Sequence, residues 1–156
     1  NLEKLSLKEL IINQVKKEKP ILGICLGMQL LANRSFEDGE HEGLGLIEGE
    51  VQGLKSDNTN FKVPNYGWCD VYSKKDCILF PKNWKPSSFY HNHSFHFKNT
   101  KPKDCSGFIK YNNNEITVAI ENKNVFGVQF HPEKSQDEGL ELIKRFLEFS
   151  TSHNNC

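Results

Sequence analysis

An excess of charge of one sign is missing from this sequence. Lys and Arg together number 20, and Asp and Glu also number 20, so the formal net charge is zero. Binding to nucleic acid or to an anionic membrane surface usually needs a basic excess or a basic stripe. The charge balance therefore predicts neither of these partners.

Long apolar segments are also missing. The longest apolar run is too short to span a bilayer. Positions 1–19 are polar with a helical spacing of leucines, which differs from the pattern of a signal peptide. The five cysteines are odd in number and irregularly spaced, and they contain no C-x-x-C pair, so they predict neither a zinc knuckle nor a thioredoxin-like site. Free thiols favour a reducing compartment, and we expect a cytoplasmic protein. The cysteines are Cys25, Cys69, Cys77, Cys105 and Cys156.

The length and composition are typical of one globular domain. The chain has 156 residues, of which 37% are hydrophobic and 26% charged, and no linker divides it, so we assign a single domain to 1–156. The first half predicts a helix over 3–18 that ends before Pro20, a buried strand over 20–24 and a helix over 27–33. Because the chain opens within a helix and without Met, we expect the domain to be incomplete at its N-terminus.

Short strands dominate the second half. Candidates lie at 44–54, 62–64, 71–72, 89–97, 108–111, 116–121 and 125–130, and an amphipathic helix is expected over 136–150. The asparagine-rich segments 112–114 and 122–124 are expected to form hairpin tips, because Asn tolerates the left-handed conformation. The pattern as a whole indicates an α/β domain.

Cys25 lies where the predicted strand meets the following helix, with Gly23 and Gly27 two residues to either side. This arrangement is typical of a nucleophile elbow, in which the side chain leaves the carboxyl edge of a sheet and small neighbours relieve crowding. A helix N-terminus favours a thiolate, and the backbone N–H of Leu26 is placed to hold an oxyanion. The alternative is a buried structural cysteine.

His131 directly follows the predicted strand 125–130, and Glu133 stands two residues further on. A cysteine nucleophile needs a base to accept its proton, and the imidazole needs an acceptor that fixes its tautomer. If the chain stays extended through Pro132, both side chains point to the same side. A surface turn is the alternative for this segment taken alone.

Three further histidines, His91, His93 and His96, lie close together. Two of them on one strand face have the spacing of metal ligands, but no nearby carboxylate or cysteine completes a set. We therefore predict no metal site and no cofactor.

Two segments resemble class-I (triad) glutamine amidotransferases: Gly-Ile-Cys-Leu-Gly-Met-Gln at 23–29 and Gly-Val-Gln-Phe-His-Pro-Glu-Lys-Ser at 127–135. Segments 43–51, 64–68 and 90–95 and the last helix are similar to the subfamily that forms the glutaminase subunits of imidazole glycerol phosphate synthases. The resemblance covers essentially the whole chain.

The resemblance implies a three-layer, flavodoxin-like α/β domain with a mixed sheet. It implies that Cys25 attacks the side-chain amide of L-glutamine, that His131 transfers the proton and that Glu133 orients His131. It also implies a heterodimer with a (β/α)8-barrel synthase, which uses the ammonia to make imidazole glycerol phosphate and AICAR in histidine biosynthesis. Asn65 and Trp68 fall where the family meets that partner. The residues that fall where the family holds glutamine are Leu26, Gln29, Tyr90, Ser94 and Phe95.

The sequence departs from the subfamily pattern at three places. Asn65 stands where the family usually has histidine, and Phe95 where it usually has tyrosine. The first strands of the family and a glycine-rich oxyanion loop are absent. These differences keep alternatives open: a paralogue that supplies ammonia for amidination of a bacterial surface sugar, a non-catalytic binding subunit, or a cysteine hydrolase with another γ-glutamyl substrate.

Overall fold

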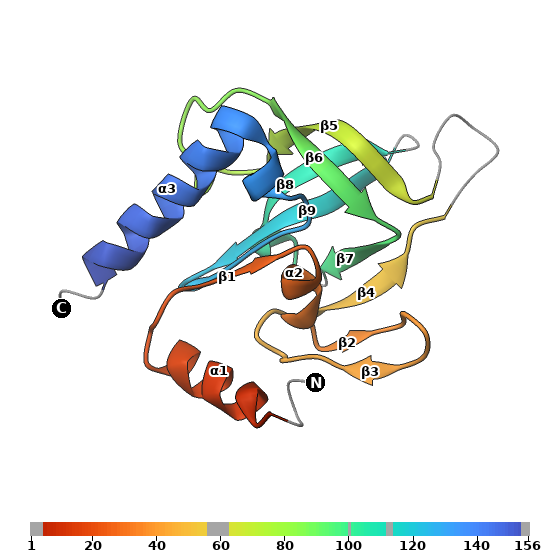
Figure 1. Cartoon of the computed structure of the whole chain (residues 1–156), viewed down its shortest axis with the longest axis vertical. Helices are drawn as coiled ribbons and strands as arrows, with labels where there is room; N and C mark the ends of the chain where they lie inside the picture. The colour runs from red at the N-terminus through yellow and green to blue at the C-terminus, as the bar shows by residue number, and fades with distance from the viewer. Residues whose placement is uncertain (1–4, 56–62, 100, 112–113, 154–156) are drawn as a thin grey trace.

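A mixed six-stranded sheet forms the centre of the fold. The computed structural model describes residues 5–55, 63–99, 101–111 and 114–153. The strand order of the sheet is β1-β10-β9-β8-β5-β6, and Figure 1 shows β8 and β9 side by side within it. β1 and β10 run parallel, while the other neighbours run antiparallel. Its strands are β1 (Ile21–Ile24), β5 (Asn65–Ser73), β6 (Ser87–His93), β8 (Cys105–Tyr111), β9 (Asn114–Asn122) and β10 (Val125–Val128).

A second sheet of four short strands lies beside the first, in the order β3-β2-β4-β7. β6 and β7 follow each other directly, and the chain leaves the first sheet for the second at Ser94. The residue that joins the two sheets is therefore one of the predicted glutamine-binding residues. The strands of the second sheet are β2 (Arg34–Ser35), β3 (His41–Glu42), β4 (Gly49–Gly53) and β7 (Phe95–Asn99).

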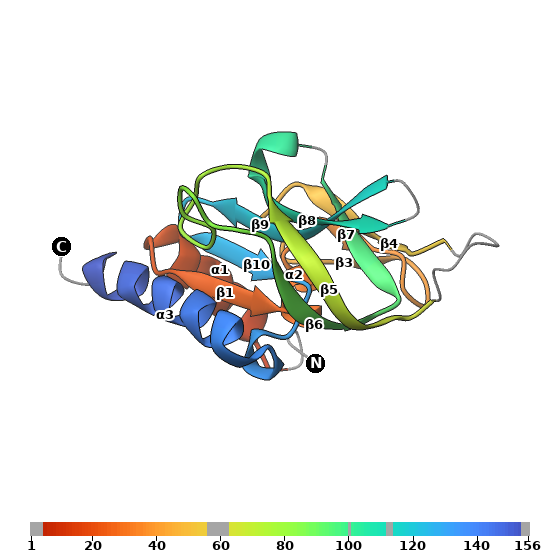
Figure 2. The same cartoon turned by 90° about the horizontal axis from the view of Figure 1, so that it is seen from above.

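Helices cover both faces of the sheet around β1 and β10. Figure 2 shows α3 (Gln136–His153) in front of β1 and α1 (Leu7–Lys16) behind it. The ring of Phe126 packs on one face against Phe146 and Phe149 of α3, with ring centroids 5.4 and 5.1 Å apart. Val125 points to the other face, into a cluster with Met28 and partly buried Val15. The prediction of an α/β domain with a mixed sheet is confirmed.

Two very short helical segments complete the part of the fold that carries the predicted site. α2 (Leu26–Leu30) directly follows Cys25, and the 3-10 helix η2 (Pro132–Lys134) directly follows His131. A second 3-10 helix, η1 (Pro102–Asp104), precedes β8. Within the described residues, no helix is long and apolar enough to cross a bilayer.

Several predicted boundaries are wrong. Residues 65–70, which lie between the strands expected at 62–64 and 71–72, belong to β5, and Gly67 allows a φ of 117° within that strand. β10 ends at Val128, and α2 is shorter than the helix expected over 27–33. In the hairpin between β9 and β10, the positive φ of 54° belongs to Lys123 rather than to an asparagine. Residues 112–113 and Cys156 lie outside the described part of the chain.

Candidate active site

The backbone of Cys25 is held in an unusual conformation between β1 and α2. Its φ is 51° and its ψ is −107°, in a region that side chains other than glycine rarely adopt. Its N–H donates to the carbonyl of Val128 at 2.8 Å, which continues the parallel pairing of β1 with β10 by one residue. The sharp turn from strand to helix that an elbow requires is therefore present, and the hydrogen bond to Val128 holds the strained backbone in place.

Gly23 explains why the elbow needs a small residue. A Cβ at Gly23 would lie 2.5 Å from the carbonyl oxygen of Gly27. Gly27 itself has open space around the corresponding position. The predicted crowding of strand against helix is thus present at Gly23. At Gly27 a side chain would fit, and only its backbone takes part in the close contact.

The environment of the Cys25 thiol opposes ionisation. Burial raises its pKa above the ordinary value, and this outweighs the lowering by the backbone N–H of Leu26 and by the side-chain amide of Gln129. α2 spans five residues, so its dipole is small. The N–H at the start of α2 lowers the pKa of the thiol in the expected direction, but burial outweighs it, so the thiol needs a base to take its proton.

His131 and Glu133 form a close pair. His131 Nδ1 lies 2.7 Å from Glu133 Oε1. The chain does not stay extended as expected: His131 is extended, but Pro132 to Lys134 form η2. The 3-10 turn nevertheless returns the carboxylate to the imidazole. With the Nδ1 proton donated to Glu133, the Nε2 of a neutral imidazole is left as the proton acceptor.

Backbone contacts fix His131 against β6. Its N–H donates to the carbonyl of Tyr90 at 2.9 Å. Ser135 is buried, and its hydroxyl donates to the His131 carbonyl at 2.6 Å while accepting the Tyr90 N–H at 3.0 Å. Ser135, the C-terminal cap residue of η2, was not among the predicted site residues.

Gln29 and Gln129 connect the elbow to β7. Gln29 Nε2 donates to the Phe95 carbonyl at 3.3 Å and to Gln129 Oε1 at 3.2 Å. Gln129 Nε2 in turn lies 3.7 Å from the Cys25 sulfur. Gln129 is fully buried and was not among the predicted site residues. Gln129 directly follows β10, whose last residue pairs with Ile24 at the end of β1. A polar residue at this place, next to Cys25, is the feature that could have indicated a role in the site.

The other predicted glutamine-binding residues lie around this centre. Leu26 follows Cys25 directly and is 60% exposed. Tyr90 is half-buried, and its ring centroid is 6.4 Å from that of His131. Ser94 lies at the bend between β6 and β7, where its carbonyl accepts the Leu54 N–H at 2.8 Å. The fold thus brings segments from β1, β6, β7 and β10 to one place.

The two residues predicted at a partner interface point in opposite directions. Asn65 is buried, with its amide 3.1 Å from His93 Nε2 and its oxygen accepting the Cys69 thiol at 3.5 Å. Trp68 is 50% exposed, and its ring lies edge-on to Tyr90 with centroids 6.1 Å apart. In the isolated chain, Trp68 is accessible to a partner and the Asn65 side chain is not.

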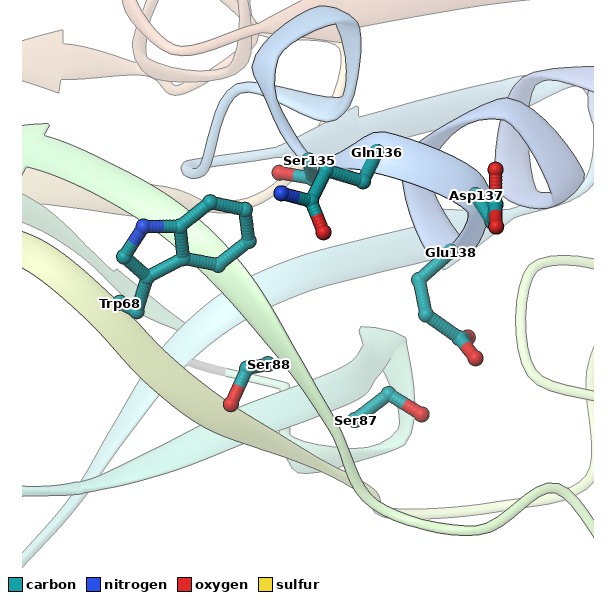
Figure 3. Close-up of a pocket in the computed structure, with 7 residues that line it drawn as sticks. All are labelled: Trp68, Ser87, Ser88, Ser135, Gln136, Asp137 and Glu138. Atoms are coloured by element: carbon teal, nitrogen blue, oxygen red, sulfur yellow. The ribbon is translucent and has the colours of Figure 1, made fainter.

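A surface cleft lies where η2 ends and α3 begins. Figure 3 shows Trp68 from β5 facing Ser135 and Gln136 at the start of α3, with Ser88 of β6 below. Ser135 contacts the cleft on one side and the backbone of His131 on the other. The remaining lining residues are Ser87, Asp137 and Glu138.

Two of the three clustered histidines are buried next to the site. His91 Nδ1 lies 3.2 Å from His93 Nε2, and His93 Nδ1 lies 2.9 Å from the Phe95 carbonyl oxygen. Burial lowers the pKa of His91 to about 3 and that of His93 to about 4. Within the described ranges, no group of three or more His, Cys, Asp or Glu side chains is arranged to hold a metal ion.

Comparison with known proteins defines the class. The family described as glutamine amidotransferase class-I matches residues 3–149. The chain therefore belongs to this family and is a glutamine-hydrolysing enzyme, as its sequence predicts.

Among the relatives, the chain is similar to glutaminase subunits of imidazole glycerol phosphate synthase. It is 43% identical over 140 residues to the subunit HisH of Pyrococcus furiosus, which covers 90% of this chain and 70% of that protein. It is also 43% identical over 146 residues to HisH of Wolinella succinogenes, covering 91% and 70%. The subfamily that the sequence resembles is thereby confirmed.

Solved structures agree on the fold. A glutamine amidotransferase from Thermotoga maritima matches with a TM-score of 0.59 at 24% identity and covers 98% of this chain and 57% of that one. A glutamine amidotransferase from Methylobacillus flagellatus matches with a TM-score of 0.56 at 19% identity, covering 94% and 49%. At these identities the likeness concerns the fold alone.

The buried histidines predict that stability falls in mild acid. Since the pKa values of His91 and His93 are lowered in the folded state, the unfolded chain binds more protons below the ordinary value of 6.5. Folding stability should therefore fall as pH drops from about 6.5 towards 4, by up to about 1.4 kcal/mol per pH unit for each histidine. Urea unfolding across this range measures the loss.

His91→Leu should make this dependence shallower, while the exposed His153→Ala should leave it unchanged. An identical pH dependence in His91→Leu and the unaltered chain would contradict the assignment.

Proposed function

We propose that the chain is the glutaminase subunit of an imidazole glycerol phosphate synthase, with Cys25 as nucleophile, His131 as base and Glu133 as the residue that orients His131. The observation that carries this proposal is the common edge of β1 and β10. The two strands are parallel, with Ile24 opposite Val128. The segments that carry Cys25 and His131 therefore both leave the sheet at the carboxyl ends of these strands. The 2.7 Å contact of His131 with Glu133 supplies the orientation.

The proposed reaction has two halves. The Cys25 sulfur attacks the side-chain carbonyl carbon of glutamine, and its proton passes to His131 Nε2. His131 then protonates the leaving nitrogen as the C–N bond breaks, which releases ammonia and leaves a glutamyl thioester. A water molecule, deprotonated by His131, attacks the thioester carbon. Glutamate leaves, and the proton returns to the cysteine.

Neighbouring residues are proposed to bind the substrate and the developing charge. The backbone N–H of Leu26 follows the nucleophile and stabilises negative charge at the sulfur and at the carbonyl oxygen. Gln29, Tyr90, Ser94 and Phe95 lie on the segments that surround Cys25 and His131 and are proposed to hold the glutamine.

Ammonia is proposed to pass to a (β/α)8-barrel synthase subunit in a heterodimer. The exposed aromatic side chains Tyr66 and Trp68 support a protein interface, because exposed aromatics next to one another are enriched at such surfaces. Both rings pack edge-on against Tyr90, which itself lies next to His131. A partner on this surface would therefore cover the active site. The four described cysteines are free thiols, in keeping with the cytoplasm as the place of the reaction.

Cys25→Ala should reduce kcat for glutamine hydrolysis by at least about 10³-fold, because none of the other three described thiols lies beside His131 to replace the nucleophile. Glutamate release in the presence of the synthase subunit measures this. Cys77→Ala is the matched control, since Cys77 is also a half-buried free thiol but lies on the loop between β5 and β6. Turnover close to that of the unaltered protein in Cys25→Ala would refute the nucleophile.

Trp68→Ala should weaken association with the synthase subunit by about tenfold or more, because a large exposed aromatic ring is lost from the centre of the proposed interface. Isothermal titration calorimetry gives the Kd. Ile78→Ala, which truncates an exposed apolar side chain on the loop after β5, should leave the Kd unchanged. Equal affinities for both variants would remove Trp68 from the interface.

Expression in a histidine auxotroph that lacks its glutaminase subunit should restore growth without histidine. Cys25→Ala should fail to restore it, which separates catalysis from mere support of the synthase. If the unaltered protein is expressed and folded but does not rescue growth, the ammonia serves another acceptor, such as a surface sugar.

A further inference from the structure

Gln129 is a buried polar side chain for which the reaction described above has no role. It is fully buried, two residues before His131. Its backbone N–H donates to the Val118 carbonyl at 2.8 Å, so β9 fixes the point from which the side chain starts. From there the amide reaches two residues of the site, Gln29 and Cys25.

A chain of hydrogen bonds determines which way this amide points. The Phe95 carbonyl can only accept, so the side chain of Gln29 must turn its NH2 group towards it. The second hydrogen of that NH2 group is donated to Gln129 Oε1 at 3.2 Å. Gln129 must therefore present its own NH2 group to the Cys25 sulfur, at 3.7 Å. The Phe95 carbonyl therefore fixes the orientation of both amides. Exchanging the O and N atoms of either amide would place two acceptors or two donors against each other.

An N–H group aimed at sulfur distinguishes the thiolate from the thiol. It is a weak partner of a neutral sulfur and a stronger partner of an anionic one. Around Cys25 it acts against burial, together with the N–H of Leu26. Because Gln129 is buried and held at both ends, it supplies this N–H without reorganisation when the proton leaves.

We propose that Gln129 is a positioning residue of the glutaminase reaction: it holds the sulfur of Cys25 in place, donates an N–H to the thiolate, and connects the nucleophile to the substrate-binding residue Gln29. The inference rests on the proposed role of Cys25 as nucleophile.

The chemistry of the side chain accounts for glutamine at this position. Glutamate has the same length, but it would lose the donor and place a carboxylate beside the sulfur, where a thiolate would be repelled. Methionine has a similar length and no charge, but it cannot donate a hydrogen bond. The two variants Gln129→Met and Gln129→Glu therefore separate the loss of the donor from the addition of a charge.

The test measures the reactivity of each thiol directly. The folded protein is treated with iodoacetamide over a range of pH from about 6 to about 10, and the labelled peptides are quantified by mass spectrometry. At neutral pH the rate at Cys25 should fall by about fivefold in Gln129→Met and further in Gln129→Glu, with both profiles shifted to higher pH. Cys69, a half-buried thiol in the same molecule, should react at an unchanged rate.

Glutamine hydrolysis supplies the second measurement. In Gln129→Met, kcat should fall by about fivefold at neutral pH and recover at higher pH, where the thiolate forms without help. A pH profile at Cys25 that matches the unaltered protein in both variants would overturn the proposal. So would a parallel change at Cys25 and Cys69, because it would indicate general opening of the fold.

The outcome is separable from that of the proposed function. If Cys25→Ala retains glutaminase activity, the nucleophile is wrong, whatever the labelling profiles show. If Cys25→Ala is inactive while the Gln129 variants label as the unaltered protein does, the glutaminase stands and the role of Gln129 falls.

Discussion

The parallel pairing of β1 with β10 is the interaction on which the rest of the site depends. It is the parallel contact in a sheet whose other neighbours run antiparallel, and it places two strand ends at the same edge. The Cys25 N–H continues this pairing by donating to Val128. Cys25 is thus positioned by main-chain hydrogen bonds of the sheet rather than by a loop, and the segment that carries His131 continues from the neighbouring strand.

Two hydrogen-bonding groups, the Ser135 hydroxyl and the Phe95 carbonyl, connect the site to β6 and β7. Ser135 joins the backbone of His131 to that of Tyr90 through one hydroxyl group. The Phe95 carbonyl accepts from Gln29 and also lies against His93 Nδ1, so one backbone oxygen links β7 to the elbow and to the buried histidines of β6. A displacement of β6 would therefore shift His131 through Ser135, and Gln29 through the Phe95 carbonyl.

The sequence predicted the elements with strong local signals. Cys25 between two glycines indicated the elbow, and the short spacing of His131 and Glu133 indicated their contact. It did not predict the full length of β5, because a strand was expected only at 71–72, whereas pairing with β6 holds residues 65–71 extended. It also could not show that Asn65 points inward, since its partner His93 lies opposite it on β6, in a register that no local pattern reveals.

The left-handed backbone of Cys25 has a consequence for stability. A residue with a Cβ at a φ of 51° and a ψ of −107° costs on the order of 1–3 kcal/mol relative to an unstrained position, and glycine largely escapes this cost. A glycine at the elbow would relieve strain in the fold while removing the thiol. Selection for a stable protein would thus act against cysteine at this position, and only a requirement for its chemistry keeps it there.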